Sequence, residues 1–189
     1  MRKTITITYP ADPARTAQML ASTAYQEERV ARAGLDDASV DVAQRGQGFV
    51  STISGSVQPS QLPSVASRFV RSAVSFSIAE SWGEPKEDGS RSGGYDVTIK
   101  GAPVRVSATS TMAPASSNAD DADSAVSVEG TDASVPPQAT TVTVDIDLKV
   151  TVPLVGKTIE EKAMSMVGRV VADEERRAAA WLAEHGDEH

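Results

Sequence analysis

The 189-residue sequence contains no cysteine, which excludes disulfide bonds, thiol nucleophiles and cysteine-ligated metals and leaves the redox compartment undecided. Histidine is almost as scarce. His185 and His189 both lie at the C-terminal end, where chains commonly fray. We therefore expect no histidine-based triad and no metal site, and we assign no catalytic residue and no cofactor.

Aromatic residues are few, with two Trp, three Tyr and three Phe, so aliphatic side chains must fill the core. A chain of this length is sufficient for one domain with a substantial core. No stretch approaches the roughly 20 apolar residues of a membrane-spanning helix. Alternating Thr and Ile follow Arg2 and Lys3, unlike a secretory signal. We expect a cytoplasmic monomer without a membrane span.

Positive charge is also in deficit, because 18 Lys and Arg face 26 Asp and Glu, for a net charge of −8. This balance argues against binding to nucleic acid, which normally requires basic patches. Segment 114–140 contains five acidic residues, no Lys or Arg, and mostly Ala, Ser and Asp. Such a composition predicts a long flexible loop, with a brief strand conceivable at Val126–Val128. Strand-like flanks indicate that it extends a hairpin within a single domain, residues 1–186.

Alternating apolar residues predict strands at 3–9, 39–43, 48–57, 73–82 and 141–154. Residues 95–100 and 103–112 are interpreted as two parts of one bent strand, interrupted at Gly101. The last strand has the clearest pattern, since Val, Ile and Leu occupy every second position from Val142 to Leu154 and mostly Thr, Asp and Lys lie between them. One dry and one wet face favour an antiparallel sheet.

Two short helices are predicted at 13–21 and 23–33, the first with Asp12 as its N-cap and Pro13 after it. A long C-terminal helix is predicted from Thr158 to about Glu184, with Thr158 and Glu161 at the spacing of a capping box. One stripe on it is mostly apolar: Ile159, Ala163, Met166, Val167, Val170, Ala178 and Trp181. The nearest apolar surface for this stripe is the dry face of the sheet. We therefore predict an α+β fold in which a curved antiparallel sheet wraps around the C-terminal helix, while the two short N-terminal helices close one end.

This order of elements resembles the helix-grip fold of the START-like (SRPBCC, polyketide-cyclase and lipid-transport) superfamily. The strings "ESW" at 80–82, "KGAPVRV" at 100–106 and "VTVPLVGKTIE" at 150–160 resemble an uncharacterised bacterial branch, the domain-of-unknown-function family 2505. The resemblance covers residues 1–112 and 140–185, and segment 114–140 departs from it as an insertion. It implies a cavity between sheet and helix that takes up a small hydrophobic molecule.

We predict that ten residues contact this ligand: Phe76, Ile78, Glu80, Trp82, Val97, Ile99, Ile146, Leu148, Met166 and Val170. The first hypothesis is thus a carrier of lipid-like or polyketide-like molecules. A cyclase or aromatase with Glu80 as acid and base is the second. In the third, the interior is solid and the acidic loop contacts a protein partner.

Three features of the sequence allow more than one interpretation. Glu80 is expected to be wet at the end of its strand, although it could instead hold a ligand head group. Glu174 and Arg177 are expected to form a surface pair one helical turn apart, although both could reach a cavity. Trp82 and Trp181 could line the interior or simply pack.

Overall fold

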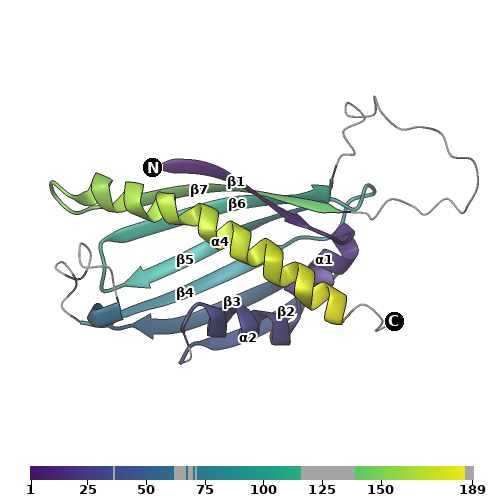
Figure 1. The fold of residues 1–189 in the computed structure, drawn as a ribbon, viewed down its shortest axis with the longest axis horizontal. Coiled ribbons are helices and arrows are strands. Elements are labelled where there is room, and N and C mark those ends of the chain that lie inside the picture. The colour runs from purple at the N-terminus through teal and green to yellow at the C-terminus, as the bar shows by residue number, and fades with distance from the viewer. Residues whose placement is uncertain (36, 62–66, 68–69, 71, 116–138, 186–189) are drawn as a thin grey trace, which may run out of the picture.

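The computed structural model describes residues 1–35, 37–61, 67, 70, 72–115 and 139–185, and Figure 1 shows how they fold. Seven strands, three α-helices and one short 3-10 helix make up these residues. In chain order they are β1 (Arg2–Tyr9), α1 (Pro13–Leu20), α2 (Thr23–Arg32), β2 (Ser39–Arg45), β3 (Gly48–Val57), η1 (Pro59–Gln61), β4 (Val74–Trp82), β5 (Arg91–Lys100), β6 (Val104–Pro114), β7 (Thr140–Val150) and α4 (Gly156–Glu184).

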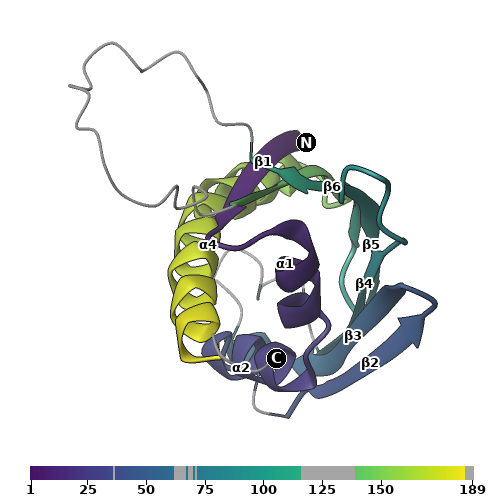
Figure 2. The same ribbon diagram turned by 90° about the vertical axis from the view of Figure 1, so that its right-hand side faces the viewer.

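All seven strands form one antiparallel sheet in the order β1-β7-β6-β5-β4-β3-β2. The sheet curves, and α4 lies across its concave side (Figure 1). Figure 2 looks along the molecule from the end where α1 lies: α1 is enclosed between the sheet and α4, and α2 lies at the rim between α4 and strands β2 and β3. The predicted helix-grip architecture, with its long C-terminal helix and two short N-terminal helices, is confirmed.

The N-terminal helices begin where the sequence indicates. Asp12 caps α1 by accepting a hydrogen bond from the Arg15 amide at 2.9 Å, and Pro13 follows it. Ser22 caps α2 in the same way, through the Tyr25 amide. Each cap satisfies an amide that would otherwise lack a partner in the first turn, and so stabilises the start of its helix.

The prediction that residues 95–112 form one bent strand is wrong. They belong to two antiparallel strands, β5 and β6, which are joined by a turn in which Gly101 has a φ of +91°. Pairing between β5 and β6 extends only over Arg91–Asp96, and beyond Asp96 the strands separate. Pro114 pairs with Thr140 across β6 and β7, as expected for flanks of an extended hairpin. Residues 116–138, which include the brief strand predicted at 126–128, lie outside the described part of the chain.

The start of α4 also differs from the prediction. The helix begins at Gly156, two residues before Thr158, and no side chain caps it, so the proposed capping box is wrong. A Cβ atom at position 156 would lie 2.4 Å from the Val150 carbonyl oxygen, so only glycine permits the chain to turn so closely past the end of β7. Leu154, predicted on the dry face, is fully exposed at a φ of +67° because it belongs to this turn.

The interior contains two separate hydrophobic clusters. The larger one packs α1, α2 and the C-terminal part of α4 against the sheet, and Ala178 and Leu182 belong to it. The smaller one joins Met164, near the start of α4, to Leu148 and Val150 on β7. Helix α4 is therefore held near both of its ends, and its middle spans the space between the clusters.

Candidate functional site

A cavity of about 510 Å³ lies between the middle of α4 and the concave face of the sheet. The sheet contributes Phe76, Ile78, Val97 and Ile146 from the set predicted by sequence. These side chains share the concave face because they alternate along paired strands; Ile78 pairs with Val97 in the β4–β5 register.

Helix α4 contributes to the cavity wall Met166 and Val170, two more of the ten residues predicted to contact a ligand. Met166 is 49% exposed and Val170 is 65% exposed, and neither belongs to a hydrophobic cluster. The sequence pattern led us to expect a stripe buried continuously on the sheet. Instead, the stripe is packed at its ends, and in the middle Val167 packs on the smaller cluster while Met166 and Val170 stay exposed, which is unfavourable for large apolar side chains.

Three of the ten predicted residues do not line this cavity. Trp82 is fully buried in the larger cluster. Leu148 packs with Val150 and Met164 in the smaller cluster. Ile99 lines a second hollow, described below. Alternation along the strands places all three on the concave face. The packing of the two clusters and the separation of β5 from β6 determine which part of that face borders the cavity.

Glu80 is buried, so the expectation that it lies in water at the end of its strand is wrong. Its residue is only 5% exposed, on the cavity wall. One carboxylate oxygen accepts hydrogen bonds from the Tyr95 hydroxyl at 3.1 Å and from the Trp82 indole at 3.0 Å. The other oxygen accepts from Nη1 of Arg29 at 3.0 Å. A carboxylate can be buried at this depth because donors surround it.

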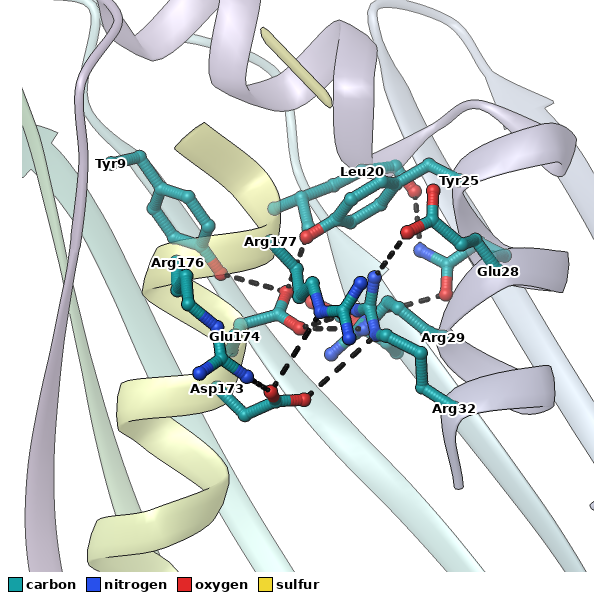
Figure 3. Close-up of polar contacts among 12 residues, drawn as sticks. Tyr9, Leu20, Tyr25, Glu28, Arg29, Arg32, Asp173, Glu174, Arg176 and Arg177 are labelled. Carbon is teal, nitrogen blue, oxygen red and sulfur yellow. Dashed lines mark hydrogen bonds and ion pairs between the residues drawn. The ribbon is translucent and has the colours of Figure 1, made fainter. Parts of the chain in front are cut away.

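Glu174 is a second buried carboxylate, so its predicted surface pairing with Arg177 is wrong (Figure 3). One oxygen accepts from the Tyr25 hydroxyl at 2.9 Å and from the Tyr9 hydroxyl at 3.4 Å. The other pairs with Nε of Arg29 at 3.4 Å and with Arg32 at 3.3 Å. Arg177 lies 3.9 Å from Asp173 instead. The apolar stripe of α4 therefore continues into a carboxylate that docks onto α2.

Arg29 joins the two carboxylates and so ties α2 to both β4 and α4. Burial alone would lower the pKa of the Arg29 guanidinium, but the charges of Glu80 and Glu174 outweigh this effect and raise it. The side chain keeps 23% of its surface accessible, and it lines the cavity. One end of the apolar cavity is therefore polar.

All three tyrosines of the chain donate to this network. Burial is the main cause that raises the pKa values of Tyr9, Tyr25 and Tyr95, and a neighbouring glutamate raises each of them further. The phenols therefore stay protonated as hydrogen-bond donors.

Ser51 contributes a hydroxyl to the same end of the cavity. Its residue is 2% exposed, and its Oγ has no hydrogen-bond partner within the described part of the chain. Ser51 pairs directly with Glu80 in the β3–β4 register, so the two side chains lie side by side on the concave face.

The sequence analysis did not single out Arg29, Ser51 or Tyr95. Alternation alone could have found two of them, because Ser51 precedes the wall residue Ile53 by two positions and Tyr95 precedes Val97 by two. No sequence signal connects Arg29 to Glu80, which lies 51 positions further along the chain.

The two tryptophans both pack within the protein. The residue opposite Trp82 across β4 and β5 is Gly93, where a Cβ would come within 2.7 Å of the indole ring. Trp181 meets the Tyr25 ring edge-on, with centroids 5.5 Å apart, and stacks on His185 at 4.0 Å. Neither lines the cavity, so packing is the interpretation that the structure supports for both.

A second hollow, of about 850 Å³, lies where β5 and β6 separate. Its wall combines side chains of the concave face, such as Val106, with side chains of the outer face, such as Arg105. Val97 and Val106 line both this hollow and the cavity, so the two spaces adjoin at the gap in the sheet.

Within the described residues, no group of three or more His, Asp or Glu side chains is arranged to hold a metal ion. Over the same residues, no helix is long and apolar enough to cross a membrane.

Several solved structures are similar to this chain. The crystal structure of a conserved protein from Geobacillus kaustophilus superposes with a TM-score of 0.51 at 9% identity, covering 96% of this chain and 97% of that one. The Zhui aromatase/cyclase from Streptomyces sp. R1128 gives 0.49 at 11% identity, with coverage of 97% and 93%. A START superfamily protein from Mycobacterium smegmatis gives 0.43 at 11% identity, with coverage of 94% and 96%. At such identities, a likeness concerns the fold alone.

No curated protein is detectably similar to the chain in sequence. A family match nevertheless covers almost its whole length, because the family described as "Protein of unknown function (DUF2505)" matches residues 4–182. This range contains the cavity, the buried network of Glu80, Arg29 and Glu174, and all three strings on which the resemblance rested. The chain therefore belongs to the DUF2505 family.

Proposed function

We propose that the protein binds a small hydrophobic molecule in the cavity between α4 and the sheet. The observation that carries this proposal is the cavity itself: about 510 Å³, walled mainly by aliphatic side chains, in a fold whose helix is packed at both ends. The volume lies within the roughly 300–1,000 Å³ of small-molecule sites. The predicted wall residues of β4, β5, β7 and α4 are the proposed contacts.

The exposed apolar side chains of α4 support the proposal energetically. Met166 and Val170 lie over the cavity and remain largely exposed. Burying one such side chain fully is worth about 1.5–3 kcal/mol, and a bound apolar molecule would recover part of that free energy. The affinity would therefore come mainly from apolar contact with the middle of α4 and the facing strands.

The two other hypotheses have less support. Both oxygens of Glu80 already accept hydrogen bonds, from Arg29, Tyr95 and Trp82, which suits a carboxylate that holds the fold together better than one that transfers protons. The interaction-module hypothesis assumed a solid interior, and the cavity does not fit that assumption. Binding remains the function that the geometry supports best.

The proposal is tested with a panel of apolar molecules, using native mass spectrometry and the shift in melting temperature. A ligand selective for the folded state raises the melting temperature by mass action. The diagnostic variant is Val170→Thr, which places a hydroxyl on the cavity wall and should weaken binding about tenfold or more. Ala172→Thr is the matched control, because it adds the same side chain at an exposed position of α4 that does not line the cavity.

If no apolar molecule binds, or if Val170→Thr and Ala172→Thr bind equally well, the cavity is not a ligand site.

A further inference from the structure

We infer that the ligand carries a neutral hydroxyl group, which binds between Ser51 and Glu80 at the polar end of the cavity. This inference rests on the proposed function and specifies the class of molecule that the cavity takes.

The hydroxyl of Ser51 is the first observation. It is buried and lines the cavity, yet it has no hydrogen-bond partner among the described residues. A buried hydroxyl without a partner is unfavourable, and such groups are uncommon in folded proteins. Because Ser51 belongs to the cavity wall, a change of its χ1 rotamer can bring the hydroxyl to a polar atom of a bound molecule.

The position of Glu80 is the second observation. Directly paired residues of antiparallel strands have Cβ atoms about 4.5–5.5 Å apart, so a single oxygen near Ser51 is also close to the Glu80 carboxylate. Arg29, Tyr95 and Trp82 fill three of the about four acceptor positions of this carboxylate. A ligand hydroxyl can accept from Ser51 and donate to the position that is left. A carbonyl oxygen can only accept.

The charge balance of this end argues against an ionised head group. The two buried carboxylates, Glu80 and Glu174, pair with Arg29 and Arg32 at 3.0–3.4 Å, and Arg32 is shared with the more exposed carboxylates of Glu28 and Asp173. An added anion would lie beside two carboxylates, and an added cation would find no unpaired carboxylate in the network. A neutral group avoids the cost of burying an uncompensated charge.

The experiment compares four probes with the same chain length: n-octane, 1-octanol, octanoate and octylammonium. Each displaces the neutral dye Nile red from the full chain, and the quantity measured is the ratio of the octanol affinity to the octane affinity. In Ser51→Ala this ratio should fall about three- to tenfold, the range expected for one neutral hydrogen bond, while the octane affinity stays the same. Octanoate and octylammonium should both bind more weakly than octanol.

Two further variants separate the hydroxyl from general effects on the strand. Ser54→Ala removes a hydroxyl three positions along β3 that does not line the cavity and bonds to Ser77 instead, so the ratio should not change. Ser51→Thr retains a hydroxyl at the site and should retain most of the ratio. Circular dichroism of each variant confirms the fold.

An unchanged ratio in Ser51→Ala, or tightest binding by octanoate, would overturn the hydroxyl assignment while leaving a hydrophobic site in place. If neither Nile red nor octane binds, the proposed function and this inference fail together.

Discussion

Nη1 of Arg29 lies 3.0 Å from the carboxylate of Glu80, and this contact connects helix α2 to strand β4 across the end of the cavity. Nε of the same guanidinium lies 3.4 Å from Glu174 on α4. A single side chain therefore connects helix α2 to both the sheet and the long helix α4. The network of Glu80, Arg29 and Glu174 forms the polar end of the cavity wall, and it also stabilises the fold.

Removal of Arg29 should be strongly destabilising. Arg29→Met keeps most of the volume but leaves Glu80 and Glu174 with less compensation, and breaking a buried ion pair costs about 3–5 kcal/mol. Urea unfolding at neutral pH measures this loss. Arg176→Met is the control, because its pair with Asp173 is largely exposed and such pairs are worth about 0–1 kcal/mol. Equal effects of the two substitutions would contradict a structural role for the network.

Alkaline pH should unfold the protein through its tyrosines. The pKa values of Tyr9, Tyr25 and Tyr95 are raised above the ordinary value of 10.0 in the folded state. Their contribution to stability is thus complete below pH 10 and is lost as the pH rises through the raised values. Absorbance at 295 nm should show no tyrosinate near pH 10 in the native protein, whereas in urea all three should titrate there. Native-state titration of any tyrosine near pH 10, with circular dichroism unchanged, would refute the burial of its hydroxyl.

Two glycine-to-alanine substitutions should have opposite effects. At Gly93 a Cβ would lie 2.4 Å from the Ser81 carbonyl oxygen and 2.7 Å from the Trp82 ring, so Gly93→Ala forces the sheet to shift and should cost about 1–3 kcal/mol. At Gly168 a Cβ meets no atom within 4 Å, and Gly168→Ala should stabilise α4 by up to about 1 kcal/mol. Thermal unfolding monitored by tryptophan fluorescence measures both. Stabilisation by Gly93→Ala would show that the indole does not cover that position.

The sequence predicted the strands and their faces because alternation is a local property. Most of the residues of β4 and β7 that it assigned to the dry face lie on the concave side, and Phe76, Ile78 and Ile146 line the cavity. Turn geometry was harder to predict. Residues 101–103 contain a glycine and a proline, which suit either a bend or a reversal, and only the pairing of β6 with both β5 and β7 distinguishes the two.

The buried network could not be predicted, because its members are distant in sequence. Glu174 and Arg32 lie 142 positions apart, and the helices that carry them meet only in the folded protein. The spacing of apolar residues along a helix also identifies the side that faces inward, but it does not show whether protein or a cavity lies opposite each residue. The predicted stripe contained Met166 and not Met164, yet Met164 packs on β7 and Met166 lies over the cavity.

Truncating a side chain should have different effects at the packed end and in the middle of α4. Leu182 is buried in the larger cluster, so Leu182→Ala should cost about 2–5 kcal/mol. Val170 lies over the cavity, so Val170→Ala removes little packing in the protein alone, and the better helix propensity of alanine offsets part of that loss. Urea unfolding should therefore show a change below about 1 kcal/mol for Val170→Ala. With saturating 1-octanol the difference between wild type and Val170→Ala should widen, because a bound molecule contacts the valine. A large loss without ligand would mean that the middle of α4 is packed on protein, and the cavity would then be closed.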